Sequence, residues 1–191
     1  MQRFGLLATV FVLAISTAAA QTSTWVPDKV HSEVDFSILH MSLSKVHGRL
    51  GNIRGTIVLN DADISKSSVN MTIDVGTVDT GQSARDADLK GANFFDVAQF
   101  PIATFVSSGV ARNGSGFTVA GNLTLHGVTK PVVLQVDDPT GPIAGMDKKP
   151  HAGYSATTTI DRTAFGIGSK YPPAMLGDEV KLSIELEVAR Q

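Results

Sequence analysis

The chain has 191 residues and no cysteine, a length typical of one domain that can bury a hydrophobic core without disulfides. Its 16 Lys and Arg residues nearly balance 18 Asp and Glu residues, and the net charge of −2 disfavours a protein that binds nucleic acid or anionic membranes through its overall charge. The 18 glycines and the frequent Val, Ile and Thr residues favour a β-rich fold.

Residues 1–20 have the layout of a secretory signal peptide. Arg3 precedes the apolar run Phe4–Ile15, and a stretch of small residues with an A-x-A pattern ends at Ala20. The apolar run is too short to span a bilayer, so we expect no integral membrane segment once the signal is removed. Cleavage after Ala20 would leave a single periplasmic or secreted domain, residues 21–191.

Hydrophobic and polar residues alternate along most of the remaining chain. The C-terminal stretch is the clearest, because Val180, Leu182 and Ile184 alternate with Lys181 and Ser183. Such a period of two is typical of a β-strand with one buried face. Eight strands are predicted in this way: Val30–His40, Val46–Leu59 with a bulge at Gly51, Val69–Val75, Ile102–Ala111, Phe117–Leu125, Val132–Val136, Tyr154–Ile160 and Val180–Val188.

The connections between these strands are short, which favours an antiparallel meander. Asn113–Gly116 has the composition of a hairpin turn, His126–Val128 of a tight link, and Asp137–Pro150 of a Gly- and Pro-rich excursion. No helical crossover recurs, so a parallel sheet is disfavoured. The prediction is therefore an all-β, eight-stranded antiparallel up-and-down barrel, with a two-sheet sandwich as the alternative.

One insertion, around residues 83–97, interrupts the strand pattern. Ser83 and Asp86 form the S-x-x-D pattern of a helix start, and a short helix is predicted over Ala84–Lys90. Asn93–Asp96 could form a second turn. Three phenylalanines gather in and after this insertion and could rim or plug an opening of the barrel; they are Phe94, Phe95 and Phe100.

The interior of an eight-stranded barrel can be filled by side chains or can hold one small ligand. The residues predicted to point inward are apolar, so the matching guest would be a long hydrocarbon. These predicted lining residues are Phe36, Ile38, Met71, Ile73, Val119, Leu123, Leu134, Leu182 and Ile184. Alternation alone leaves a dry, filled core as an open alternative, since it does not measure internal volume.

Several motifs, in order along the chain, resemble the YceI-like (polyisoprenoid-binding) proteins. They are Trp25 with Asp28, His31-Ser32, Phe36 and His40, then Lys45–Gly48, Arg85–Leu89, Phe94–Asp96 with Phe100-Pro101, Phe105, Gly121–Val132, and Asp161–Thr163 with Phe165-Gly166. The resemblance covers Trp25 to the end of the chain. It implies a lipocalin-like barrel that holds a long isoprenoid in its bore, in a periplasmic protein that is often dimeric.

Among the polar residues, His40 shares the inward face with Phe36 and Ile38, either as a ligand contact or as a hydrogen-bonded histidine at the barrel end. Arg85 is our first candidate for a phosphate head group, ahead of Lys45, Arg49, Lys90 and Arg162. The alternative is a surface or helix salt bridge such as Asp86–Lys90. We expect Asp161-Arg162 to order a loop rather than to bind ligand.

The sequence gives little support for metal binding or catalysis. His31 and His40 differ in strand parity, and the metal patterns H-x-H and H-E-x-x-H are absent. His31 and Ser32 would lie on opposite faces of a strand, too far apart to act as base and nucleophile. We therefore expect no metal, no cofactor and no enzymatic activity. The alternatives to lipid sequestration are a filled barrel that binds a protein partner through its outer surface and, last, a lipid hydrolase.

Overall fold

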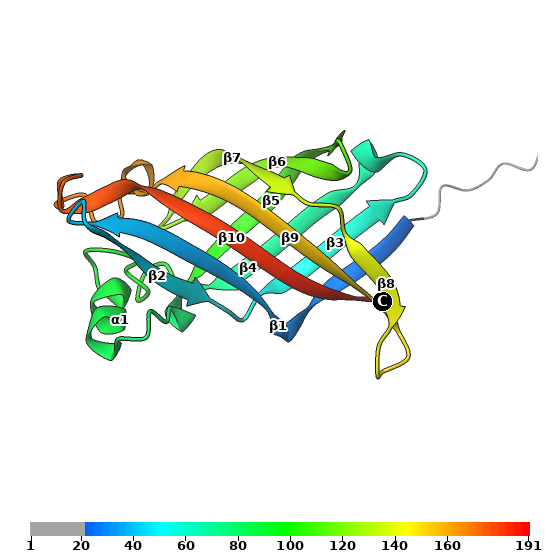
Figure 1. Ribbon diagram of the computed structural model, residues 1–191, viewed down its shortest axis with the longest axis horizontal. Helices are drawn as coiled ribbons and strands as arrows, with labels where there is room; N and C mark the ends of the chain where they lie inside the picture. Colours follow the sequence, from blue (N-terminus) through cyan, green and yellow to red (C-terminus); the bar gives the residue numbers. More distant parts are fainter. Residues whose placement is uncertain (1–21) are drawn as a thin grey trace, which may run out of the picture.

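The computed structural model describes residues 22–191, so the expected signal peptide lies outside the described residues. Ten strands and one α-helix follow one another in chain order (Figure 1). The strands are β1 (Thr22–His40), β2 (Ser44–Leu50), β3 (Arg54–Asn60), β4 (Ser68–Asp74), β5 (Ile102–Asn113), β6 (Gly116–Leu125), β7 (Val128–Val136), β8 (Thr140–Ala144), β9 (Pro150–Asp161) and β10 (Leu176–Arg190). The helices are α1 (Ser83–Lys90) and the 3₁₀ turns η1 (Ile64–Lys66), η2 (Val75–Thr77) and η3 (Arg162–Phe165).

The strands form a closed antiparallel barrel. Neighbours follow the order β10-β1-β3-β4-β5-β6-β7-β9, and β9 pairs in turn with β10. The β9–β10 ladder runs without a break from Glu179↔Asp161 to Ala189↔His151, so the circle is complete. The predicted eight-stranded barrel is confirmed, and the sandwich alternative is wrong because no pair of free sheet edges separates two layers.

Strand β1 starts at Thr22, eight residues before the predicted start at Val30. Its buried residues change parity along the way, from Ser23 and Trp25 to Ser32 and Val34. An irregularity between Pro27 and Ser32 in the pairing with β10 causes the change. The Asp28 carboxylate stabilises this irregular segment by accepting hydrogen bonds from the amides of Val30 and His31, and these bonds lower the pKa of Asp28.

The strand predicted over Val46–Leu59 is divided into β2 and β3. Both halves pair with β1, β2 through Val34–His40 and β3 through Thr22–Trp25, so together they fill one position in the barrel. The predicted bulge at Gly51 is a complete break, in which Asn52 adopts a positive φ of 54°. The Thr77 hydroxyl accepts the amide hydrogen of Gly51 across this break.

The barrel wall is weakest between β7 and β9. Backbone pairing there is limited to Gln135↔Thr157 and Val136↔Ala156, whereas β6 and β7 pair along their whole length. Two further hydrogen bonds cross the seam, from the Asp137 amide to the Ser155 carbonyl oxygen and from the Thr158 hydroxyl to the Val133 carbonyl oxygen. The first half of β7 is therefore held mainly from one side.

The insertion contains helix α1, as predicted, but its start is different. Gln82 is the N-cap and makes no side-chain capping bond, so Ser83 lies inside the helix. Asp86 instead accepts hydrogen bonds from the amide and hydroxyl of Thr80, which tie the helix to the preceding loop. The expected turn over Asn93–Asp96 is present as a hydrogen-bonded turn rather than as helix. No helix of residues 22–191 has the length and hydrophobicity to cross a bilayer.

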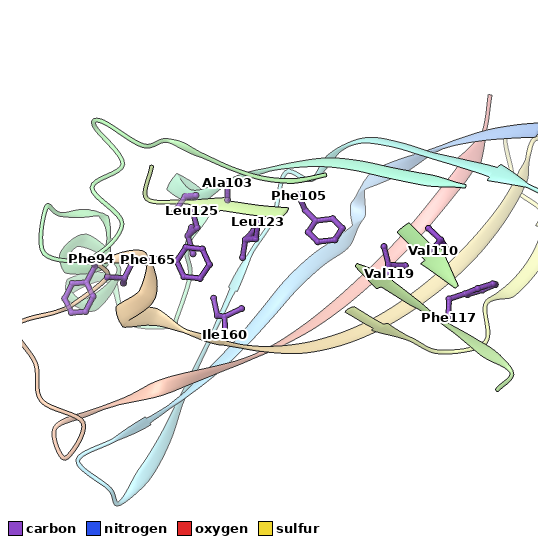
Figure 2. Close-up of a cluster of buried hydrophobic side chains, with 12 residues drawn as sticks. Phe94, Ala103, Phe105, Val110, Phe117, Val119, Leu123, Leu125, Ile160 and Phe165 are labelled. Atoms are coloured by element: carbon purple, nitrogen blue, oxygen red, sulfur yellow. The ribbon is translucent and has the colours of Figure 1, made fainter. Parts of the chain in front are cut away.

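The hydrophobic core lines the barrel along its long axis. Figure 2 shows one buried cluster whose side chains run from Phe94 and Phe165 at the α1 end, past Leu123, to Val119 and Phe117. A second cluster forms around Trp25, Ile57 and Met71 and shares packing residues such as Ile73 and Leu182 with the first. Residues from all eight barrel positions therefore face one shared interior.

Candidate ligand-binding cavity

A deep cavity of about 150 Å³ lies inside the barrel. All eight barrel positions contribute to its wall, and hydroxyl groups occur on only three of its lining residues, Ser67, Tyr154 and Thr158. Burial raises the pKa of the Tyr154 phenol, as expected for a polar group in apolar surroundings. Engineered apolar cavities of this size remain dry and accept small hydrocarbons. The deep cavity is thus suited to an alkyl or isoprenoid guest.

A second, outer cavity of about 330 Å³ occupies the end of the barrel next to α1. Its wall includes inward residues of β1 and β10 and side chains from α1 and from the loop between η3 and β10, residues 166–175. The rings of Phe94 and Tyr171 stack with centroids 5.5 Å apart, which joins the insertion to this loop. Besides the Tyr171 phenol, the titratable side chains that line the outer cavity are His40, Arg85, Asp88 and Arg162.

The two cavities meet at a ring of four apolar residues that line both. Val34 comes from β1, Ile73 from β4, Leu123 from β6 and Leu182 from β10. We call this ring the waist. The waist is therefore the shared wall between two adjoining cavities, which we together call the bore; charged side chains line only its outer cavity.

The structure brings nearly all of the predicted site residues to this bore. Met71, Val119, Leu134 and Ile184 line the deep cavity, and Ile73, Leu123 and Leu182 belong to the waist. The outer cavity receives Phe36, Ile38, His40, Arg85, Phe94 and Phe95. Phe100 lines neither cavity, because its ring packs edge-on against His126 at the β6–β7 turn, with the ring centroids 4.9 Å apart.

Other lining residues were absent from the sequence-based set. The deep cavity is also lined by Val34, Phe105, Tyr154 and Leu186. Val34 and Leu186 have the same parity as the predicted inward residues of their strands, whereas no inward residue was predicted for the strands that hold Phe105 and Tyr154. Their alternation could have identified them. The 166–175 loop contributes Ile167, Tyr171 and Met175 to the wall of the outer cavity. This loop has no periodic alternation of apolar and polar residues from which its lining residues could be predicted.

Arg85 is exposed on α1 and is anchored by one residue. Its Nε–H donates to the Thr80 hydroxyl at 2.7 Å, and one Nη donates to the Thr80 carbonyl oxygen at 2.8 Å. Within residues 22–191 it makes no ion pair, and the Asp86–Lys90 salt bridge considered from sequence is not formed. A guanidinium has five N–H groups, so Arg85 retains donors that a ligand oxygen could use.

Arg162 has a different role, which agrees with the expectation that it orders a loop. Its side chain is only 2% exposed, and it donates to five backbone carbonyl oxygens between Ile167 and Gly177 at 2.7–2.9 Å. It also forms an ion pair with Asp178 at 2.9 Å. With all three nitrogens engaged, Arg162 fixes the 166–175 loop as one wall of the outer cavity.

Residues 22–191 contain no group of three side chains suited to hold a metal. His31 and His151 both contact Glu187 at the end opposite α1, and His151 also contacts Asp147. Hydrogen bonds to Glu187 and Asp147 raise the pKa of His151. The Ser32 hydroxyl donates to the Glu187 carbonyl oxygen, so it is not paired with a histidine base.

Comparison with known proteins assigns the fold to a family. The sequence matches the YceI-like domain family over residues 25–188. Protein YceI of Salmonella newport is 36% identical over 187 residues, which cover 94% of this chain and 93% of that protein. A UPF0312 protein of Yersinia pestis is 36% identical over 159 residues, or 81% of this chain and 80% of the relative.

Solved structures agree with this assignment. Burkholderia cenocepacia BcnA superposes with a TM-score of 0.75 at 26% identity, covering 84% of this chain and 98% of BcnA. The Campylobacter jejuni YCEI protein gives 0.70 at 27% identity, covering 78% and 87%. A polyisoprenoid binding domain from Saccharophagus degradans shares the fold, with a TM-score of 0.62 at 16% identity over 87% of this chain and 98% of that domain. The protein therefore belongs to the YceI-like family.

Proposed function

We propose that the protein binds one long-chain isoprenoid lipid, such as an isoprenoid quinone or a polyprenyl phosphate, and keeps it out of water in the bacterial periplasm without transforming it. The observation that carries this proposal is the pair of adjoining apolar cavities that share the waist, with charged side chains only in the wall of the outer one. An aqueous compartment cannot dissolve such a lipid, and each CH₂ group transferred into the bore would contribute about 0.8 kcal/mol.

The distribution of polar groups suggests how the lipid lies. The tail would pass the waist and end in the deep cavity, because the wall there offers few partners to a polar head. The head would remain in the outer cavity near Arg85, whose free donors suit phosphate or carbonyl oxygens. Asp88 lies in the same wall, so a head group with both acceptors and a donor could be accommodated.

Two further observations support binding rather than catalysis. Ser32 and His31 are engaged with different partners, the Glu187 carbonyl oxygen and the Asp28 carboxylate, and so do not form a nucleophile–base pair. The Saccharophagus degradans domain with this fold is named as polyisoprenoid binding. Both point to a carrier function for the same architecture.

Solvent extraction and mass spectrometry of protein purified from a bacterial periplasm test the proposal. About one isoprenoid per protein is expected, and Leu182→Trp should reduce the loading several-fold by blocking the waist. The matched control is Lys181→Trp, since the neighbouring side chain on β10 points to the outer face. Equal loading of the two variants would refute the proposed path of the tail.

An extract without lipid from correctly folded protein would refute lipid binding itself and favour a barrel that acts through its outer surface. The proposed location has a separate readout. N-terminal sequencing of the periplasmic protein should begin at Gln21. Protein that retains Met1 and stays in the cytoplasm would contradict the periplasmic assignment.

A further inference from the structure

An exposed apolar surface borders the outer cavity. Leu39, Met41 and Leu43 come from the β1–β2 turn, and Met175 comes from the loop before β10. Leu43 is 83% exposed and Met41 is 53% exposed, and exposed apolar side chains that lie together in a patch mark candidate interaction surfaces. The adjoining residues 172–174, two prolines and an alanine, are exposed as well. We call these two segments, residues 39–43 and 172–175, the mouth tip.

The fold holds the two segments together as one surface. Met41 and Ser42 adopt positive φ values of 51° and 55°, which turn the chain sharply between β1 and β2. The amide of Met41 donates to the Met175 carbonyl oxygen at 2.8 Å, and the Ser42 hydroxyl donates to the Ala174 carbonyl oxygen. Arg162 fixes the same loop from inside through its bond to Leu176. The apolar side chains of the mouth tip are therefore presented on a rigid support.

The mouth tip is continuous with the bore. Met175 and His40 line the outer cavity, and His40 lies between Leu39 and Met41 in the chain. Figure 1 shows the β1–β2 turn and the loop before β10 projecting together from one end of the barrel, the end that carries α1. A surface that meets the mouth tip would also face the opening of the cavity.

Charge around the mouth tip favours an anionic surface. No Asp or Glu occurs between Leu39 and Lys45 or between Ile167 and Gly177, although these segments carry Lys45 and Lys170. The first following carboxylate, Asp178, is paired with Arg162. By contrast, residues 22–191 as a whole have 15 Lys and Arg against 18 Asp and Glu. Helix α1, across the outer cavity, is mixed in charge.

We propose that the mouth tip docks the protein onto an anionic lipid bilayer, so that a lipid moves between membrane and bore without crossing water. The apolar side chains would enter the boundary between head groups and acyl chains, and the two lysines would meet the lipid phosphates. This inference rests on the proposed function and adds its membrane partner. A second protein copy on the same surface is the competing occupant, and the experiment below detects it.

Flotation of the full-length mature protein with vesicles of phosphatidylcholine and about 30 mol% phosphatidylglycerol tests the docking. The double variant Met41→Ser/Leu43→Ser should bind vesicles at least about tenfold more weakly than the unaltered protein. The matched control is Ile143→Ser/Met146→Ser, which removes side chains 70% and 105% exposed from the β8–β9 hairpin at the other end of the barrel. This control should bind within about twofold of the unaltered protein.

Three outcomes would overturn the docking proposal. The unaltered protein could fail to bind vesicles, or the two double variants could lose vesicle binding equally. The third outcome is a protein dimer that only Met41→Ser/Leu43→Ser dissociates, while vesicle binding is unchanged. A second reporter does not depend on removing apolar side chains. The single native tryptophan, Trp25, is 5% exposed, so Leu43→Trp adds an indole whose emission should shift to the blue and be quenched by brominated lipids. Unquenched emission from Leu43→Trp in the presence of vesicles would contradict insertion.

The same preparations separate this inference from the proposed function. Isoprenoid in the extracts without vesicle binding would overturn the docking and leave lipid sequestration standing. Vesicle binding by a protein whose extracts contain no isoprenoid would overturn sequestration and leave the docking surface standing. A last assay connects docking with lipid sequestration by measuring how fast lipid-free protein takes up quinone from vesicles. The Met41→Ser/Leu43→Ser variant should take up quinone more slowly than the unaltered protein but reach the same final loading. An unchanged rate would count against docking.

Discussion

Replacement of Arg162 by methionine should destabilise the protein strongly, by about 3–5 kcal/mol. The side chain is 2% exposed and donates to five carbonyl oxygens and to Asp178. Even at the lower end of the net value of one hydrogen bond, about 0.5 kcal/mol, the lost bonds together contribute about 3 kcal/mol. Methionine fills similar space but leaves those oxygens without donors, and it leaves Asp178 without its cation.

Urea unfolding measured by the fluorescence of Trp25 gives the change in the free energy of unfolding. Arg49→Met is the matched control, because Arg49 pairs with Asp79 at 3.0 Å but is 59% exposed and should matter little to the unfolding midpoint. Arg162→Lys should not restore stability, since an ammonium cannot reproduce the planar fork of donors. Amide exchange in residues 166–175 should accelerate in both Arg162 variants.

A loss below about 1 kcal/mol for Arg162→Met would refute this reasoning, because it would mean that the carbonyl oxygens find other donors at low cost. Unchanged amide exchange in the 166–175 loop would refute the role assigned to Arg162 in fixing the cavity wall. An equally large loss of unfolding free energy for Arg49→Met would show that pairing of an arginine with an aspartate determines the effect, rather than the burial of the hydrogen-bonded Arg162 side chain.

Two further predictions concern pH and packing. Hydrogen bonds, first of all to Glu187, raise the pKa of His151 in the folded protein. The stabilising contribution of His151 should therefore be full below the unfolded-state pKa of about 6.5 and should vanish as pH rises through the higher folded-state pKa. In urea titrations, His151→Gln should cost more stability at pH 5.5 than at pH 8.5, and an equal cost at both pH values would contradict the pairing. Gly121→Ala would place a Cβ against the Phe105 ring and 2.7 Å from the Val106 carbonyl oxygen, so we expect a loss of about 1–3 kcal/mol in the free energy of unfolding. Gly109→Ala meets nothing within 4 Å and should be nearly neutral in the same unfolding assay. Similar losses at both positions would refute the packing argument.

The barrel could be predicted from sequence because inward and outward positions alternate over long stretches, such as Ser32–Ile38 in β1 and Val180–Val188 in β10. Leu182 and Ile184 in β10 and Phe36 and Ile38 in β1 line the bore as their parity predicts. Strand β8 was missed and described only as an excursion, because Thr140–Ala144 is exposed on both faces and shows no alternation. Its pairing with β9 comes from the hairpin context rather than from burial.

The features that sequence could not place depend on contacts between distant segments. Asp86 was assigned to the start of the helix, yet it bonds Thr80 in the preceding loop. Phe100 was grouped with Phe94 and Phe95 by proximity in sequence, but its ring packs on His126 outside the cavities. The wall formed by the 166–175 loop depends on Arg162, whose partners are backbone carbonyls and so leave no pattern of side chains.

A crystal structure of the protein purified with its native ligand would test the central claim most directly. We predict continuous density for a hydrocarbon chain that runs from the outer cavity, between Leu123 and Leu182, into the deep cavity. Side chains that close the waist in a protein carrying bound lipid, with the lipid density confined to the outer surface of the barrel, would contradict the account.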